Sequence, residues 1–154
     1  MTDLSVVNSS FTLEREYAAR PKQVFAAWAD PAAKGRWFGG PSAEHHALDF
    51  RPGGTEVTRG RNDEGQLLTF ESCYHDIVAD RRIVYSSTLS VENTCVTISL
   101  TTVQLEARRD GTTLLLTEHA AFLDGHEQPE WREQGTRGQL TALGAALAAV
   151  TNQH

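Results

Sequence analysis

The chain is poor in cysteine and contains no long apolar run. Its two cysteines, Cys73 and Cys95, fit a reducing compartment, and we expect both to be small, buried apolar residues. No segment approaches the roughly 18 consecutive apolar residues that a membrane-spanning helix needs. The start, MTDLSVVNSS, lacks the basic region and the apolar stretch of a signal peptide. These absences predict a cytoplasmic protein with no membrane partner.

Positive charge is also scarce, because the chain has 14 Lys and Arg residues and 20 Asp and Glu residues. Its formal net charge is −6. Nonspecific nucleic-acid binding needs a basic surface that displaces counterions from the phosphates. Docking on an anionic membrane surface depends on clustered basic residues in the same way. The composition therefore argues against both kinds of partner.

Several familiar motifs are missing as well. There is no G-x-S-x-G nucleophile elbow, no phosphate-binding loop and no dinucleotide fingerprint. Cys73 and Cys95 fall on predicted strands that are separated by a third, so about 10 Å of sheet argues against a disulfide. The six histidines show no metal-ligand spacing; they are His45, His46, His75, His119, His126 and His154. We expect neither a metal nor a cofactor.

What is present indicates one globular domain over residues 1–154, with an ordered core from about residue 10 to 151. The length suits a single domain. Hydrophobic residues make up 40% of the chain and charged residues 22%, which is typical of a globular protein. No internal repeat or linker-like segment divides the sequence.

Near the N-terminus the hydrophobic period changes from that of a strand to that of a helix. Residues 11–19, FTLEREYAA, alternate as a half-buried strand does. Residues 21–30 follow the helical period, and a proline suits the first turn. Asp30 and the following proline then start a second short helix, which the glycines at 39–40 end.

The middle of the chain is a series of strands joined by short turns. Each turn carries Gly, Pro, Asn or Asp, and the segments between them are rich in Thr, Val, Ile, Tyr and Phe. Such a series predicts an antiparallel meander. The expected strands lie within residues 42–50, 55–61, 66–78, 83–89, 95–107 and 112–122.

A long helix is predicted over about residues 128–151. Its apolar stripe has helical spacing and consists of Leu140, Leu143, Leu147 and Val150. A second face carries one large ring followed by small residues, namely Trp131, Gly135, Gly138 and Ala142. Glycine within a helix costs about 1 kcal/mol relative to alanine. Two explanations stay open, close packing of the helix on the sheet and space left for a ligand.

The order of these elements predicts an α+β fold in which a curved antiparallel sheet of six to seven strands wraps round the long C-terminal helix. Two short helices follow the first strand. The helix is the element long enough to cover the apolar face of the sheet. A twisted sheet does not close over the whole of one helix, so a gap between them is the default binding site.

Five segments match a known superfamily. They are WADP at 28–31, RWFGGP at 36–41, FRPGG at 50–54, DRRIVY at 80–85 and TEHAAFLDG at 117–125. With the order of elements, they resemble the START-like helix-grip (SRPBCC) superfamily, and within it proteins related to the activator of the ninety-kilodalton heat-shock chaperone ATPase. The similarity extends over about residues 10–150. It implies the helix-grip fold but no single activity, since the superfamily includes lipid and hormone binders, polyketide cyclases and chaperone cofactors.

The dipeptide Glu118-His119 stands near the end of an apolar strand. Neighbours on a strand point to opposite faces, so we expect Glu118 to lie on the inner face with Leu114 and Leu116, and His119 to face solvent. A buried carboxylate needs a partner, for which the candidates are Arg15, His75 and the Trp131 indole. Glu118 is a candidate ligand contact and a weak candidate catalytic residue.

The strand at 66–78 has two candidate inner faces. One carries Leu68, Phe70, Ser72, Tyr74 and Asp76, and its aromatic rings favour it as the inner face. If the other face points inward instead, Glu71 and His75 enter the cavity and acid–base chemistry becomes available.

Aromatic residues are the best candidates for a ligand-binding site. The candidate residues, together with Glu118, are Trp28, Trp37, Phe38, Phe70, Tyr74, Tyr85, Phe122 and Trp131. The tyrosine hydroxyls can orient a polar ligand group.

Three functions remain open. The favoured one is a module that binds a small apolar or amphipathic molecule, and is not an enzyme. The family resemblance implies a second, a stress-response cofactor that contacts a chaperone. The third is a cyclase-like or hydrolase-like enzyme that uses Glu118 with Tyr85, His75 or Glu71.

Overall fold

The computed structural model describes residues 4–40 and 43–151, so Pro41, Ser42 and His154 lie outside it. Within these residues, two short helices follow the first strand and a long helix ends the chain. The elements are β1 (Val6–Tyr17), α1 (Pro21–Ala29), α2 (Pro31–Gly35), β2 (Ala43–Leu48), β3 (Thr55–Arg61), β4 (Leu67–Val78), β5 (Arg82–Val91), β6 (Thr94–Arg108), β7 (Gly111–Leu123) and α3 (Pro129–Thr151).

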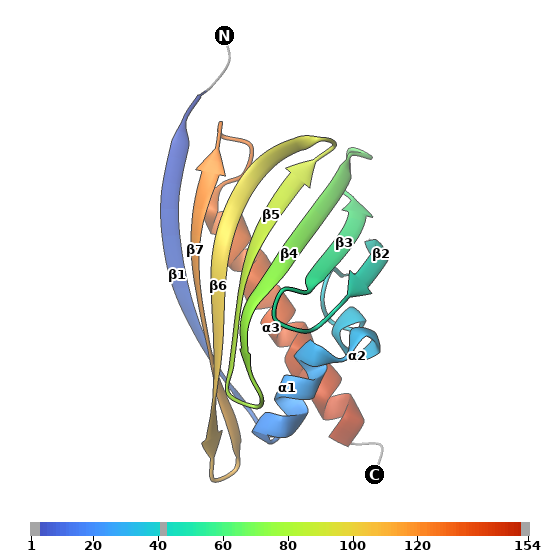
Figure 1. Ribbon diagram of the computed structural model, residues 1–154, viewed down its shortest axis with the longest axis vertical. Helices are drawn as coiled ribbons and strands as arrows, with labels where there is room; N and C mark the ends of the chain where they lie inside the picture. Colours follow the sequence, from blue (N-terminus) through green and yellow to red (C-terminus); the bar gives the residue numbers. More distant parts are fainter. Residues whose placement is uncertain (1–3, 41–42, 152–154) are drawn as a thin grey trace.

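All seven strands form one antiparallel sheet in the order β1-β7-β6-β5-β4-β3-β2. Strands β2 to β7 are the predicted meander, and β1 pairs with β7 so that Leu13 lies opposite Leu116. The sheet curves, and α3 runs diagonally across it while α1 and α2 lie beside the lower half of α3 (Figure 1). The predicted α+β helix-grip fold is therefore confirmed.

The two short helices are separated by a single residue. Asp30 caps α2, since its Oδ2 accepts a hydrogen bond of 2.9 Å from the backbone N–H of Ala33. After α2 the chain turns at Gly39, whose φ of 90° suits glycine. A Cβ atom there would lie 2.9 Å from the methyl group of Thr58, so glycine also permits close approach to β3.

The core lies between α3 and the sheet. Leu13, Leu114 and Leu116 contribute from the sheet. Three residues of the predicted apolar stripe, Leu140, Leu143 and Leu147, contribute from α3, whereas the fourth, Val150, is 43% exposed. Burial of each leucine stabilises the fold by roughly 1.5–3 kcal/mol.

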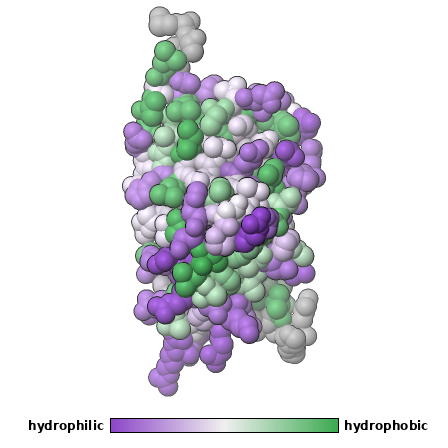
Figure 2. Space-filling view, viewed as in Figure 1, coloured by the Kyte–Doolittle hydropathy of each residue, from purple (hydrophilic) through white to green (hydrophobic). Residues whose placement is uncertain are grey.

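Apolar and polar side chains are interspersed on the surface in view in Figure 2, with apolar residues gathered where β1 begins. Val6 and Val7 are about half exposed there. Cys73 and Cys95 are free thiols on β4 and β6, on either side of β5, and each is only half-buried, so the expectation of full burial was wrong. Among the described helices, none is long and apolar enough to cross a membrane.

The glycines of α3 have different surroundings. A Cβ atom built on Gly135 or Gly138 meets no heavy atom within 4 Å, so close packing on the sheet does not explain these two residues. A Cβ atom on Gly144 would lie 3.2 Å from the ring of Tyr17. That ring is held in place, because its hydroxyl donates a hydrogen bond of 2.7 Å to the carbonyl oxygen of Leu140.

Alanine substitutions should distinguish the open space around Gly135 and Gly138 from the close packing at Gly144. Gly135→Ala and Gly138→Ala should each raise the free energy of unfolding by up to about 1 kcal/mol through helix propensity. Gly144→Ala should gain less or lose stability, because Tyr17 cannot move away without breaking its hydrogen bond. Urea unfolding monitored by circular dichroism measures the three differences. Equal gains at all three positions would contradict the packing described for Gly144.

Candidate ligand-binding site

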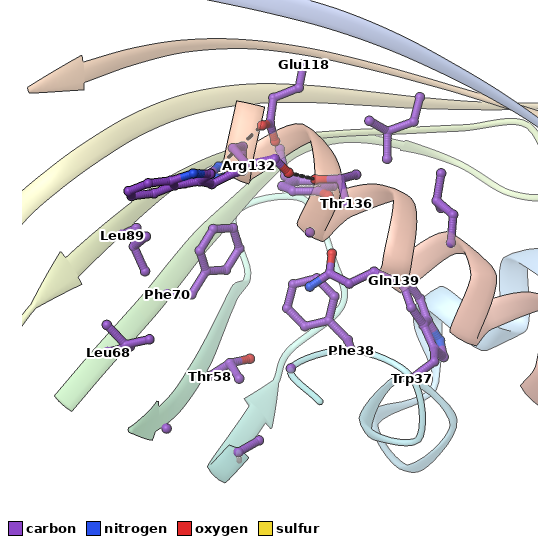
Figure 3. Close-up of a pocket in the computed structure, with 18 of the residues that line it drawn as sticks. Trp37, Phe38, Thr58, Leu68, Phe70, Leu89, Glu118, Arg132, Thr136 and Gln139 are labelled. Carbon is purple, nitrogen blue, oxygen red and sulfur yellow. Dashed lines mark hydrogen bonds and ion pairs between the residues drawn. The ribbon is translucent and has the colours of Figure 1, made fainter. Parts of the chain in front are cut away.

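A cavity of about 240 Å³ lies between the sheet and the N-terminal half of α3. Its walls come from α1, the segment 37–39, β2 to β5, β7 and α3 (Figure 3). The lining residues are Trp28, Trp37, Phe38, Gly39, Ala43, Thr58, Gly60, Leu68, Phe70, Tyr85, Leu89, Leu116, Glu118, Glu127, Trp131, Arg132, Gly135, Thr136, Gln139 and Leu140.

Most of the cavity wall is apolar. Phe38 packs edge to face on Trp37 at 5.7 Å between ring centroids, and its other neighbour is Phe70 at 5.8 Å. Figure 3 shows Leu68, Leu89 and Phe70 on one side of the cavity, with Glu118 and Arg132 joined on another. This combination of apolar walls with a few convergent polar groups is typical of small-molecule sites.

The polar part of the wall centres on Arg132, which joins two carboxylates. Its Nη1 lies 3.3 Å from Oε2 of Glu118, and its Nη2 lies 3.2 Å from Oε1 of Glu127. Nε of Arg132 adds a bond of 3.4 Å to the other oxygen of Glu127. Thr101 donates a hydrogen bond of 2.9 Å to Glu118, and Thr97 donates one to Glu127. These groups hold both carboxylates in place.

The predicted orientation of the Glu118-His119 pair is confirmed, but the predicted partners of Glu118 were wrong. Glu118 is 5% exposed, while His119 faces solvent. Its partners are Thr101 and Arg132. Sequence reasoning missed Arg132 because the carboxylate and the guanidinium are brought together only when α3 docks on β7.

The three residues predicted as partners of Glu118 make other contacts or none with it. Arg15 donates to the backbone oxygen of Arg137, and His75 hydrogen-bonds the hydroxyl of Ser86 at 2.7 Å. Trp131 lies at the rim of the cavity with 60% of its surface exposed.

The aromatic face of β4 points inward as far as Tyr74, as favoured from its sequence. The prediction was wrong for Asp76, because the register shifts between Tyr74 and Asp76, so that Ile77 packs on the core and Asp76 pairs with Arg82 at the surface. Leu68 and Phe70 line the cavity, whereas Glu71 and His75 are exposed on the opposite face. These two side chains cannot reach a molecule that contacts Glu118. The acid–base chemistry considered for them therefore has no basis in this geometry.

The structure brings most of the predicted site residues together. Trp28, Trp37, Phe38, Phe70, Tyr85, Glu118 and Trp131 line the cavity. Tyr74 and Phe122 do not: Tyr74 is fully buried with its hydroxyl 2.6 Å from Glu56, and Phe122 lies farther along β7. Contact with a ligand remains a prediction for the lining residues.

A buried ion pair beside the cavity was not foreseen. Nζ of Lys34 lies 2.9 Å from Oε1 of Glu56, and the two side chains are 1% and 2% exposed. Tyr74 donates to the same oxygen at 2.6 Å, and Nε2 of His46 lies 2.7 Å from the second oxygen. The ammonium group also lies 4.4 Å from the ring centroid of Phe38. The sequence gives one hint of this pair: the period-two pattern of TEVTRGR places Glu56 on the same face of the strand as Thr58.

Burial and pairing act in opposite directions on this ion pair. Burial lowers the pKa of Lys34 below its ordinary value, and the Glu56 carboxylate offsets this only in part. Burial alone would raise the pKa of Glu56, but the charge of Lys34 and hydrogen bonds from Tyr74, Lys34 and His46 outweigh it. The net pKa of Glu56 is therefore lowered, and the carboxylate stays ionised.

A curved antiparallel sheet around a long C-terminal helix, with a cavity between them, defines a helix-grip, START-like domain. The family model described as "Activator of Hsp90 ATPase homolog 1-like protein" matches residues 18–148. The chain belongs to this family.

Solved structures support the assignment. A protein from Rhizobium leguminosarum is 38% identical with a TM-score of 0.90, over 94% of this chain and 97% of that one. The Mll3558 protein from Rhizobium loti is 42% identical with a TM-score of 0.86, over 92% and 99%. Ara h 8.0201 shares the fold alone, at 15% identity and a TM-score of 0.70, over 93% and 99%. A comparison with curated proteins gave no match.

Removing the charge of Glu56 should destabilise the domain. Glu56→Gln leaves the buried Lys34 ammonium without its anionic partner, and we expect the free energy of unfolding at neutral pH to fall by about 3–5 kcal/mol. Because the folded-state pKa of Glu56 is lowered, its contribution is present above the ordinary value of 4.5 and is lost as the pH falls. The difference between wild type and variant should therefore shrink below that pH.

A matched control is Glu44→Gln, which breaks a solvent-exposed pair with Arg61 at 3.5 Å. Its effect should stay below about 1 kcal/mol. Urea titrations across the acid range measure both variants. A difference for Glu56→Gln that grows on acidification would contradict the assignment.

Proposed function

We propose that this domain binds one small apolar or amphipathic molecule in the cavity between the sheet and α3. The observation that carries the proposal is the cavity itself, with its aromatic walls and the polar side chains that converge on one part of it. A concave, mostly apolar pocket with a few well-placed polar groups is the usual form of a small-molecule site.

Two residues of the cavity wall carry a buried polar atom. Among the described residues, Nε1 of Trp28 and Oγ1 of Thr58 are buried without a hydrogen-bond partner, and both residues line the cavity. Leaving a buried polar group unpaired costs about 1–3 kcal/mol. Each atom has less than 1 Å² of accessible surface, so both lie behind the cavity surface and a bound molecule reaches them only if the side chains shift.

The volume limits the size of the ligand. At roughly 30 Å³ for each water molecule, about 240 Å³ corresponds to some eight waters. Ligand sites commonly span about 300–1,000 Å³, so this cavity is at the small end. A molecule of one or two rings suits it better than a long acyl chain.

The family description supports a second candidate function, an interaction with a chaperone ATPase. The test is an ATPase assay of the host's own chaperone of that class, with and without the purified domain. Stimulation would support this function. Unchanged turnover, with no binding in a pull-down, would exclude it.

Ligand binding can be tested by filling the cavity from α3. Gly135→Leu adds a side chain at a position that lines the cavity. We expect it to weaken binding of 1-naphthylamine, a two-ring fluorophore that is neutral at pH 7, at least tenfold. All three tryptophans of the chain line the cavity, so energy transfer from tryptophan to the dye measures occupancy.

The matched control is Gly138→Leu on the same helix. Its side chain also meets open space, but position 138 does not line the cavity, and the gain in helix propensity is the same. This variant should bind the dye within twofold of wild type. Equal loss in both variants, or no binding by the wild type, would count against the proposal.

A further inference from the structure

We infer that the cavity selects its ligand by charge, accepting neutral or cationic molecules that donate a hydrogen bond and rejecting anions. This inference rests on the proposed ligand-binding function and names the chemical class of the ligand. Three observations carry it: the net charge of the wall, the pairing of Arg132, and the acceptor capacity of the two glutamates.

The net charge of the cavity wall is negative. Among the described residues, the charged side chains that line the cavity are Glu118, Glu127 and Arg132, which sum to −1. Their side chains are only 6%, 16% and 10% exposed, so solvent screens them little. An anion that enters this space loses its hydration and meets a net repulsion.

The single cation on the described wall is already engaged. Each of the three guanidinium nitrogens of Arg132 has a carboxylate acceptor, Nη1 on Glu118 and both Nε and Nη2 on Glu127. The guanidinium carbon also lies 5.7 Å from the ring centroid of Phe70. A guanidinium has five N–H groups, and an anionic ligand would reach the two that remain only beside both fixed carboxylates, whose negative charge repels it.

The nearest other buried cation is balanced. Lys34 is paired with Glu56 at 2.9 Å, and it does not line the cavity. Its ammonium lies within 4.4 to 5.6 Å of the ring centroids of Trp28, Trp37 and Phe38. It offers no free charge to a ligand.

The two glutamates retain unused acceptor capacity. A carboxylate has about four lone-pair sites. Glu118 accepts one hydrogen bond at each oxygen, from Thr101 and Arg132, and Glu127 accepts three, one from Thr97 and two from Arg132. A ligand hydroxyl, amide N–H or ammonium can use the remaining sites. Burial and the nearby carboxylates of Glu118 and Glu56 raise the pKa of Tyr85, so its hydroxyl stays protonated on the same wall.

The test compares three ligands of nearly equal shape, naphthalene carrying a hydroxymethyl, an aminomethyl or a carboxylate group. Quenching of tryptophan emission at neutral pH gives each dissociation constant. We expect the alcohol and the amine to bind wild type at least tenfold more tightly than the carboxylate. This ranking tests the inference without any substitution.

A substitution then tests the cause of the ranking. Glu127→Gln changes the net charge of the wall from −1 to zero, and should strengthen carboxylate binding and weaken amine binding at least threefold each. The control is Glu133→Gln, a neighbouring acid that pairs with Arg137 and does not line the cavity. It should leave all three constants within twofold of wild type.

The outcomes separate the two proposals. If the carboxylate binds wild type as tightly as the alcohol, the charge inference is overturned while ligand binding stands. If none of the three ligands and no 1-naphthylamine binds, both proposals fall.

Discussion

The structure depends on how α3 is held against the concave face of the sheet. Its C-terminal half is held by apolar packing of Leu143 and Leu147, and by the close approach of Gly144 to Tyr17. Its N-terminal half is held differently, by the bonds of Arg132 to Glu118 and Glu127. Between these two attachments the helix carries Gly135, which sends no side chain towards the sheet. The cavity is the space left there.

This arrangement explains why a carboxylate can be buried on an otherwise apolar strand. Glu118 follows Leu114 and Leu116 on the inner face of β7, where an isolated charge would be costly. Thr101 on the neighbouring strand and Arg132 on the helix compensate that cost. The same bonds position a negatively charged wall opposite Phe70 and Leu68, which gives the cavity one polar and one apolar side.

Much of this fold could be predicted from periodicity and turn chemistry. The meander of β2 to β7 follows from the short turns, and the long helix, the inward face of β7 and that of β4 as far as Tyr74 follow from helical and period-two patterns. The pairing of β1 with β7 joins segments far apart in the sequence and could not be predicted from these patterns. The partners of Glu118 could not be predicted, since Arg132 is on a helix whose rotation and height above the sheet depend on the packed core. The pair of Lys34 and Glu56 was missed for the same reason: it joins α2 to β3, and the whole of β2 lies between them in the sequence.

Tyr74 shows the limit of reasoning from residue type. It was expected at the ligand site because an aromatic ring with a hydroxyl suits one, and its strand face is the correct one. Its hydroxyl instead donates a hydrogen bond to Glu56, so the ring helps to hold the short helices in place. Position along a strand, and not the face alone, decides whether a side chain reaches the cavity.

The buried ion pair has a consequence for which parts of the domain can move. If α2 moved outward, the Lys34 ammonium would separate from the Glu56 carboxylate while both are still shielded from water. That side of the domain is therefore rigid. On the first turn of α3, Trp131 is 60% exposed, and Gly135 beside it has open space around it. Rotation of this uncharged ring would separate no ion pair, whereas a shift of the helix itself would break the bonds of Arg132 to Glu118 and Glu127.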